Sequence, residues 1–127
     1  MKNNTSKLQK QADTLMQEVG KLKYPKSLVS GLPTQVMHHY VPKSVSSGLR
    51  YDWDNLIPLT NGEHCRLHQS PDPDIENKIL FKKGGEVWYQ QLRFRGNQYH
   101  KVNEQMYRDV ISRLETEKST ITSGLNR

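Results

Sequence analysis

Two short apolar segments within residues 36–69 constrain the fold of this chain more than any other feature. Residues 36–41 (Val-Met-His-His-Tyr-Val) read as a strand that ends before Pro42. Residues 56–59 (Leu-Ile-Pro-Leu) predict a second short strand. Because proline has no N–H to donate, Pro58 places this second strand at an edge or an end of the sheet. The segment between them is rich in Ser and Gly and predicts a loop.

A helix-start signal follows the second strand directly. Thr60 with Glu63 three residues later is the pattern of a capping box, in which each side chain binds the backbone N–H of the other residue. We therefore expect a helix from Thr60, which Pro71 and Pro73 stop. Strand, loop, strand and helix in this order predict a ββα unit over residues 36–69.

The N-terminal segment carries an apolar stripe that predicts a helix over residues 6–22. The stripe has alternating four- and three-residue spacings, and consists of Leu8, Ala12, Leu15, Val19 and Leu22. Two interpretations stay open. The helix either packs on its own domain, or it forms a short dimer seam, although two heptads are fewer than a coiled coil usually needs.

The C-terminal third predicts helices within residues 74–117. These cover residues 74–83, 86–94 and 98–117, and Gly84–Gly85 closes the first. Residues 118–127 are expected to be a frayed, flexible tail. The whole chain of 127 residues suits one domain, 1–127, of the α+β class. It is mainly helical, with the ββα unit at its centre.

Composition points to a polyanionic partner without establishing one. Lys and Arg number 19 against 13 for Asp and Glu, so the net charge is +6. This positive charge indicates either a basic surface that is simply solvated or a surface that binds nucleic acid. The single cysteine, Cys65, excludes an intramolecular disulfide and a Cys-Cys zinc site. No signal peptide or apolar run of about 20 residues is present, so we expect a cytoplasmic protein without a membrane partner.

Four of the five histidines lie between residues 38 and 68. His64 and His68 are four residues apart, so they share one face of the predicted helix and can bind one metal ion. Residue 65 is Cys rather than Glu, which disfavours the HExxH protease signature. His38 and His39 would point to opposite faces of a regular strand. For both to serve one site, the strand must be twisted or must be ending there.

These residues together resemble the HNH endonuclease motif, also called the ββα-metal or His-Me finger. The resemblance rests on His38–His39, on Asp54-Asn55-Leu56 with Leu59, and on His64 and His68. The colicin-type version likewise pairs two histidines on its first strand and ends in HxxxH on its helix. The fold implied is a two-stranded hairpin with one metal-bearing helix. More loosely, residues 47–55 and the stretch 75–92 resemble the phage NinG/Rap type of recombination nuclease.

The sequence departs from this family in its cysteines. Many HNH proteins, including the NinG type, carry Cys pairs that bind a structural zinc. Here Thr60 and Glu63 stand where the second pair would be, and no CxxC precedes His38. We therefore expect no structural zinc, and we interpret Cys65 as a small buried or inert thiol.

The resemblance to the HNH motif implies a role for each of the motif residues. His38, His64 and His68 would bind one divalent metal ion, which is Mg, Mn, Ni or Zn. His39 would be the general base, since the ordinary pKa of histidine suits that task. Asn55 either pins the loop that carries the base or binds the metal, and the pinning role is favoured because three histidines are available as ligands.

DNA contacts are expected from basic residues near the motif and in the C-terminal helices. They are Lys43, Arg50, Arg66, Lys82, Lys83, Arg93 and Arg95. Arg50 is the preferred phosphate clamp, although a plain surface charge is an equal alternative for Lys43, Arg50 and Arg66. Arg66 lies between the two helical ligands, an arrangement that favours its pointing away from the cleft.

The function that the resemblance implies is a metal-dependent DNA endonuclease, an HNH phosphodiester hydrolase. The NinG/Rap likeness favours branched or junction DNA in phage recombination, and a homodimer would suit cutting of paired strands. Two alternatives remain. One is a non-catalytic DNA-binding module that retains the finger, but such a module would have no use for His39. The other is a histidine-rich structural metal site, which would not need the adjacent His38–His39 pair.

Overall fold

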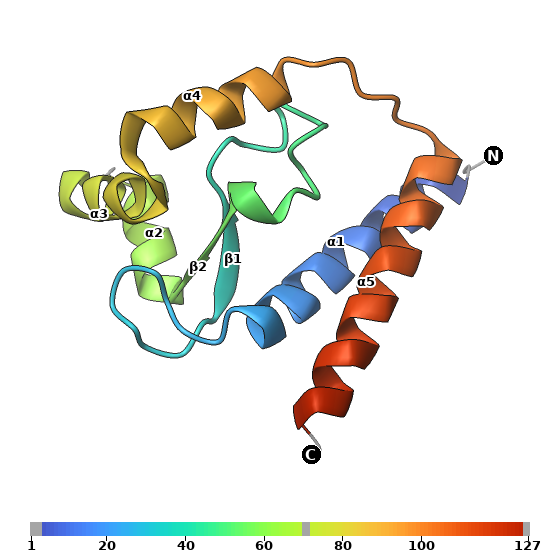
Figure 1. Cartoon of the computed structure of the whole chain (residues 1–127), viewed down its shortest axis with the longest axis horizontal. Helices are drawn as coiled ribbons and strands as arrows, with labels where there is room; N and C mark the ends of the chain where they lie inside the picture. The colour runs from blue at the N-terminus through green and yellow to red at the C-terminus, as the bar shows by residue number, and fades with distance from the viewer. Residues whose placement is uncertain (1–3, 70–71, 126–127) are drawn as a thin grey trace.

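The computed structural model describes residues 4–69 and 72–125 of the chain (Figure 1). Within these ranges it contains five α-helices, one two-stranded sheet and a short 3-10 helix, η1. The elements in order are α1 (Asn4–Lys23), β1 (Val36–His39), η1 (Trp53–Asn55), β2 (Leu56–Leu59), α2 (Asn61–Gln69), α3 (Pro73–Lys83), α4 (Gly85–Gly96) and α5 (Glu104–Leu125). This composition confirms the predicted α+β class with mainly helical content. No helix of the described segments is long and apolar enough to cross a membrane.

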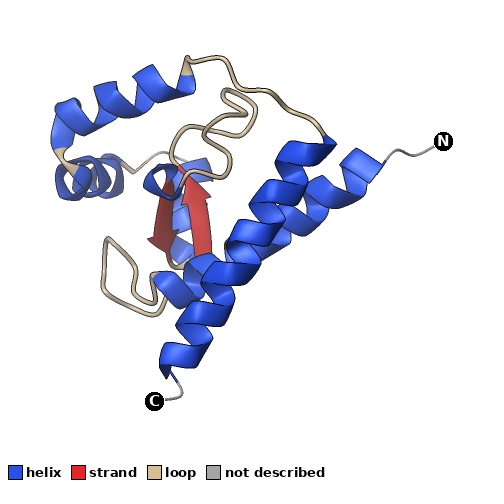
Figure 2. Ribbon diagram, turned by 45° about the vertical axis from the view of Figure 1, so that its right-hand side comes forward, coloured by secondary structure: helices blue, strands red, loops and turns tan. Residues whose placement is uncertain are grey.

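Helices α1 and α5 lie side by side and run in the same direction (Figures 1 and 2). Gln9 donates a hydrogen bond to the hydroxyl of Tyr107 near the start of both helices. Glu18 and Lys118 form an ion pair farther along. Ala12 and Leu114, both fully buried, belong to the core between the two helices. The apolar stripe of α1 therefore packs on its own domain, which is the first of the two interpretations that its spacing allowed.

The predicted flexible tail at residues 118–127 is wrong as far as residue 125, because α5 continues to Leu125. Its last turns are anchored to α1 by Lys118 and by Ile121, which packs against the core. Residues 126–127 lie outside the described part. The start of this helix also differs from the prediction, since residues 98–103 are not helical and α5 begins at Glu104.

The hairpin pairs β1 with β2 in antiparallel register, with His38 opposite Ile57 and His39 opposite Leu56. The second strand has its predicted bounds, whereas the first ends at His39 instead of Val41. One backbone bond continues the ladder beyond His39, from the Tyr40 N–H to the Asn55 carbonyl at 2.9 Å, and the Val41 N–H then binds the Asn55 side chain at 2.7 Å. The strand therefore ends at the histidine pair, which is the condition for His38 and His39 to serve one site.

Pro58 lies inside the hairpin without the loss of a ladder bond. It stands opposite Met37, whose N–H and C=O both point outward and bind the side-chain amide of Gln17 in α1, each at 2.9 Å. Gly20 allows this close approach, since a Cβ atom there would lie 2.4 Å from the Met37 side chain. Helix α1 thus closes the outer edge of β1 and fixes the strand that carries the histidines.

The capping box at the start of α2 is present as predicted. The Thr60 N–H binds the Glu63 carboxylate at 2.8 Å, and the Glu63 N–H binds the Thr60 hydroxyl at 3.2 Å. Glu63 is buried, and it also accepts a hydrogen bond of 2.6 Å from Ser27. The prediction for Cys65 is wrong in one respect, because its side chain is exposed rather than buried.

Helices α3 and α4 cover the face of the hairpin opposite to α1 and α5 (Figure 1). Ile79 and Leu92 of these helices pack with Ile57 in a second core. Pro73 begins α3 rather than ending α2, because a proline at the first helical position loses no hydrogen bond. Pro71 lies outside the described residues. The turn into α4 uses Gly84 and Gly85, both with positive φ (125° and 73°).

Candidate active site

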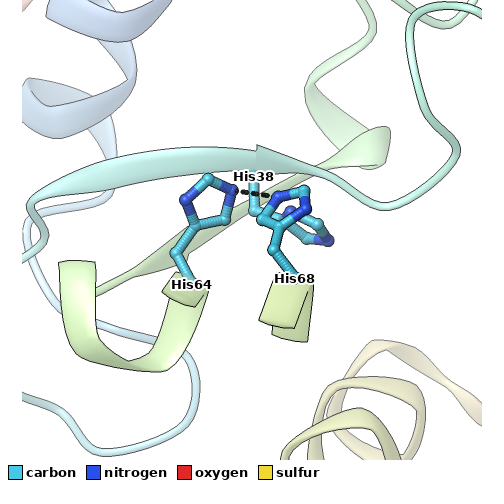
Figure 3. A group of neighbouring side chains, drawn as sticks. All are labelled: His38, His64 and His68. Atoms are coloured by element: carbon cyan, nitrogen blue, oxygen red, sulfur yellow. Dashed lines mark hydrogen bonds between the residues drawn. The ribbon is translucent and has the colours of Figure 1, made fainter. Parts of the chain in front are cut away.

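Three histidine side chains converge between the hairpin and α2 (Figure 3). His38 comes from β1, and His64 and His68 come from one face of α2, as their four-residue spacing predicts. The Nε2 atoms of His64 and His68 are 2.9 Å apart. The ring of His38 lies 5.1 Å from that of His64 and 5.7 Å from that of His68 between centroids.

This cluster could hold a metal ion. Its ligand atoms all lie within 4.8 Å of one another. Two nitrogens bound to one ion are at most about 4.2 Å apart, because each bond is about 2.1 Å, so modest ring rotations suffice. Within the described residues this is the one cluster of metal-ligand type, and it consists of three imidazoles with no carboxylate or thiolate. Three protein ligands leave a coordination position for water or substrate, which is typical of catalytic rather than structural zinc sites.

Burial keeps His38 and His64 neutral and therefore ready to bind a cation. Burial, reinforced by the neighbouring His64 and His68, lowers the pKa of His38 to about 4. Burial and His68 likewise lower the pKa of His64. A neutral imidazole has a nitrogen lone pair to donate, whereas an imidazolium has none. At neutral pH, His38 and His64 thus require no loss of a proton to become ligands.

His39 is held differently from its neighbour. Its Nε2 atom lies 3.0 Å from the carbonyl oxygen of Arg50 in the loop between the strands. Because a carbonyl only accepts, Nε2 carries the proton in this contact, and Nδ1 of the neutral ring then has the lone pair. Burial lowers the pKa of His39, against the carbonyl contact that raises it, and the positive charges of Lys43 and Arg50 lower it further. His39 is thereby fixed in one tautomer with one basic nitrogen.

Asn55 binds both ends of the loop between the strands. Its Oδ1 accepts from the Val41 N–H at 2.7 Å, and its Nδ2 donates to the carbonyls of Val41 and Leu49 at 3.0 and 3.2 Å. The side chain is fully buried. These contacts pin the loop, and they engage both the oxygen and the nitrogen of the side-chain amide in hydrogen bonds to the backbone. A catalytic role for Asn55 stays a prediction.

Sequence reasoning did not identify Asp13 as part of this region. Its carboxylate in α1 accepts two hydrogen bonds from the Arg50 guanidinium, at 2.9 and 2.5 Å, and one from the Tyr51 hydroxyl at 2.8 Å. Burial alone would raise the pKa of the Asp13 carboxyl, but these hydrogen bonds and the charge of Arg50 bring it below its ordinary value. The only signal in the sequence was an acid beside the apolar stripe of a helix.

Some of the predicted DNA-binding residues have partners within the chain, whereas others are exposed. Three form ion pairs within the chain, namely Arg50 with Asp13, Lys83 with Asp54, and Arg95 with Asp52 and Asp54. Lys82 donates to the Leu28 carbonyl. Lys43, Arg66 and Arg93 are exposed. Asp54 contacts the basic side chains of both Lys83 and Arg95. The preferred clamp, Arg50, is thus already occupied by a carboxylate.

Comparisons of the chain with protein-family models, with curated proteins and with solved structures found no match. The site must therefore be interpreted from its own geometry.

Proposed function

We propose that this protein is a metal-dependent DNA endonuclease of the HNH type, with one divalent ion bound by His38, His64 and His68. The observation that carries the proposal is the convergence of these three side chains, one of them from the residue that precedes His39 in the chain, and His39 is held in one tautomer by the Arg50 carbonyl. A hairpin followed by a histidine-bearing helix is the arrangement that the ββα-metal resemblance implies.

In this proposal each residue has a distinct task. A bound divalent ion would stabilise the negative charge that develops on the phosphoryl and leaving oxygens. His39 takes a proton from the attacking water at Nδ1, since Nε2 is engaged with Arg50. Asn55 and Asp13 act at a distance, because they fix the loop that carries the Arg50 carbonyl.

Two observations support an enzyme over the other metal-binding alternatives. A structural metal site would be closed by four ligands, whereas His68 is exposed and the cluster has three. A binding module would need no imidazole held in one tautomer, as His39 is held by the Arg50 carbonyl. We also propose DNA as the substrate because exposed Lys43, Arg66 and Arg93 and the net charge of +6 favour a phosphate backbone.

The experiment that tests the proposal is cleavage of linear, nicked, flapped and four-way-junction DNA with Mg, Mn, Ni or Zn. We expect wild-type cleavage to require metal, and His39→Ala to lose at least about 100-fold in rate, as removal of a general base does. Tyr99→Ala is the control, because Tyr99 is 88% exposed and is not part of the cluster. DNA binding without cleavage under every metal would reject the endonuclease and favour the non-catalytic module.

A further inference from the structure

A cavity of about 470 Å³ opens directly beside the histidine cluster. Its lining includes His38 from β1, Tyr40 from the loop that follows β1, Leu67 from α2, Glu76 from α3, and Tyr89 and Arg93 from α4. We call it the aromatic cavity. Its volume lies in the range of small-molecule sites, about 300–1,000 Å³. Because His38 is part of its wall, a group inside the cavity would neighbour whatever binds at the cluster.

Two tyrosines form a corner of the aromatic cavity. The ring centroids of Tyr40 and Tyr89 are 5.9 Å apart with their planes at 75°. Tyr40 is supported from behind by Trp88, at 5.0 Å between centroids. Both tyrosines are only half-buried, so part of each ring remains accessible. Aromatic side chains in such positions bind nucleobases by stacking, and they tolerate any base because every base has a π-face.

The charges of the aromatic cavity favour a base over a phosphate in its interior. Glu76 and Asn77, both exposed, belong to its lining. A carboxylate repels a phosphate, but it accepts a hydrogen bond from the exocyclic amino group of a base. Arg93, exposed and with one N–H 3.4 Å from the Tyr89 hydroxyl, supplies a positive charge for the phosphate attached to that base.

We propose that the aromatic cavity binds one unpaired nucleobase of the DNA strand whose phosphate lies at His38, His64 and His68. This inference rests on the proposed endonuclease function and names its substrate class. A base inside a duplex is stacked and paired, and it must leave the helix to enter such a site. The protein therefore prefers DNA with unpaired nucleotides, such as flaps and mismatches, over intact duplex.

The test measures binding without metal, with the full chain and oligonucleotides that contain 2-aminopurine. The fluorescence of this base changes when it stacks on an aromatic ring. We expect a change with single-stranded DNA and none with a fully paired duplex. Tyr89→Leu should weaken single-strand binding about tenfold and duplex binding less than twofold. Tyr99→Leu is the matched control, because Tyr99 is 88% exposed and lies outside the cavity lining; it should change neither affinity.

Further variants keep the test decisive if Tyr89→Leu fails to fold. Tyr89→Phe retains the ring and should bind as the wild type does. Asn77→Met, at an exposed position, extends an aliphatic chain into the cavity and should reduce single-strand binding selectively. Flapped and mismatched duplexes distinguish a single-stranded branch from an extruded base as the source of the ligand.

Two results would overturn the inference. One is an equal loss of single-strand and duplex affinity in the cavity variants, and the other is no loss in either. Cleavage that depends on His39 would still stand in that case, so the endonuclease would survive a failure of the cavity. Conversely, selective binding of unpaired bases without cleavage under any metal would retain the cavity and reject the endonuclease.

Discussion

The Asp13 carboxylate in α1 holds the Arg50 guanidinium through two hydrogen bonds of 2.9 and 2.5 Å, and the carbonyl of the same Arg50 faces Nε2 of His39 at 3.0 Å. The Tyr51 hydroxyl adds a third hydrogen bond to Asp13. The Arg113 side chain binds the Tyr51 carbonyl at 2.8 Å. The peptide that orients His39 is therefore fixed by helices at both ends of the chain.

Asp13→Asn should reduce the cleavage rate about tenfold while leaving DNA affinity nearly unchanged, because a small misplacement of a catalytic group is costly. The measurement is the single-turnover rate at saturating DNA, together with the dissociation constant. Asp109→Asn is the control, since Asp109 is exposed on α5 and its carboxylate contacts Gln105. An Asp13→Asn protein that cleaves at the wild-type rate would show that the ion pair does not position His39.

The same ion pair should make stability depend on pH in a definite direction. The pKa of Asp13 is lower in the folded protein than its ordinary value of 3.8, because its hydrogen bonds to Arg50 and Tyr51 outweigh the effect of burial. The unfolded chain then binds the proton more readily. The stabilisation is present above pH 3.8 and is lost as the pH falls through the folded pKa.

Urea denaturation of the wild type and of Asp13→Asn at several pH values measures this effect. At pH 7 we expect the variant to be less stable by about 1 kcal/mol, a modest value because the pair is partly exposed. The difference should shrink as the pH falls below 3.8. A difference that is constant from pH 7 to pH 2 would mean that the Asp13 charge contributes nothing.

Local signals in the sequence predicted the elements that carry the site. One such signal is the capping box of Thr60 and Glu63, and another is the four-residue spacing of His64 and His68. Both lie within one or two turns of a helix, so neither depends on contacts with distant segments of the chain. Packing of the N-terminal helix on its own domain was among the alternatives, since an apolar stripe must be covered, but no local signal named α5 as its partner. The spacing identified His64 and His68 of the three-histidine cluster, whereas His38 was assigned to it by the resemblance to the HNH motif.

Contacts between distant segments could not be predicted. The partner of Arg50 is a single acid far away in the sequence, and no pattern distinguishes Asp13 from other helical acids. For the same reason Lys83 and Arg95 were assigned to DNA, although Asp54 lies against both. The aromatic cavity combines the end of β1 with α4, and its existence depends on how these elements pack.

Asn55→Ala should destabilise the protein by about 2–4 kcal/mol, because it leaves buried backbone groups of Val41 and Leu49 without their partner. Urea denaturation at pH 7 measures this. Asn97→Ala, at an exposed position after α4, serves as the comparison. A loss below about 0.5 kcal/mol, the size expected of an ordinary surface substitution, would contradict the pinning role and would imply that water replaces the amide.

Binding of a divalent ion should stabilise the folded chain through the three-histidine cluster. An ion at a hundred times its dissociation constant contributes about 2.7 kcal/mol, which corresponds to roughly 10 °C in Tm for a domain of this size. We expect this shift with Zn or Ni in thermal denaturation of the wild type. It should be lost in His64→Ala and retained in His100→Ala, because His100 is not part of the cluster. Equal shifts in all three proteins would place the bound ion elsewhere and would remove the basis for a metal at His38, His64 and His68.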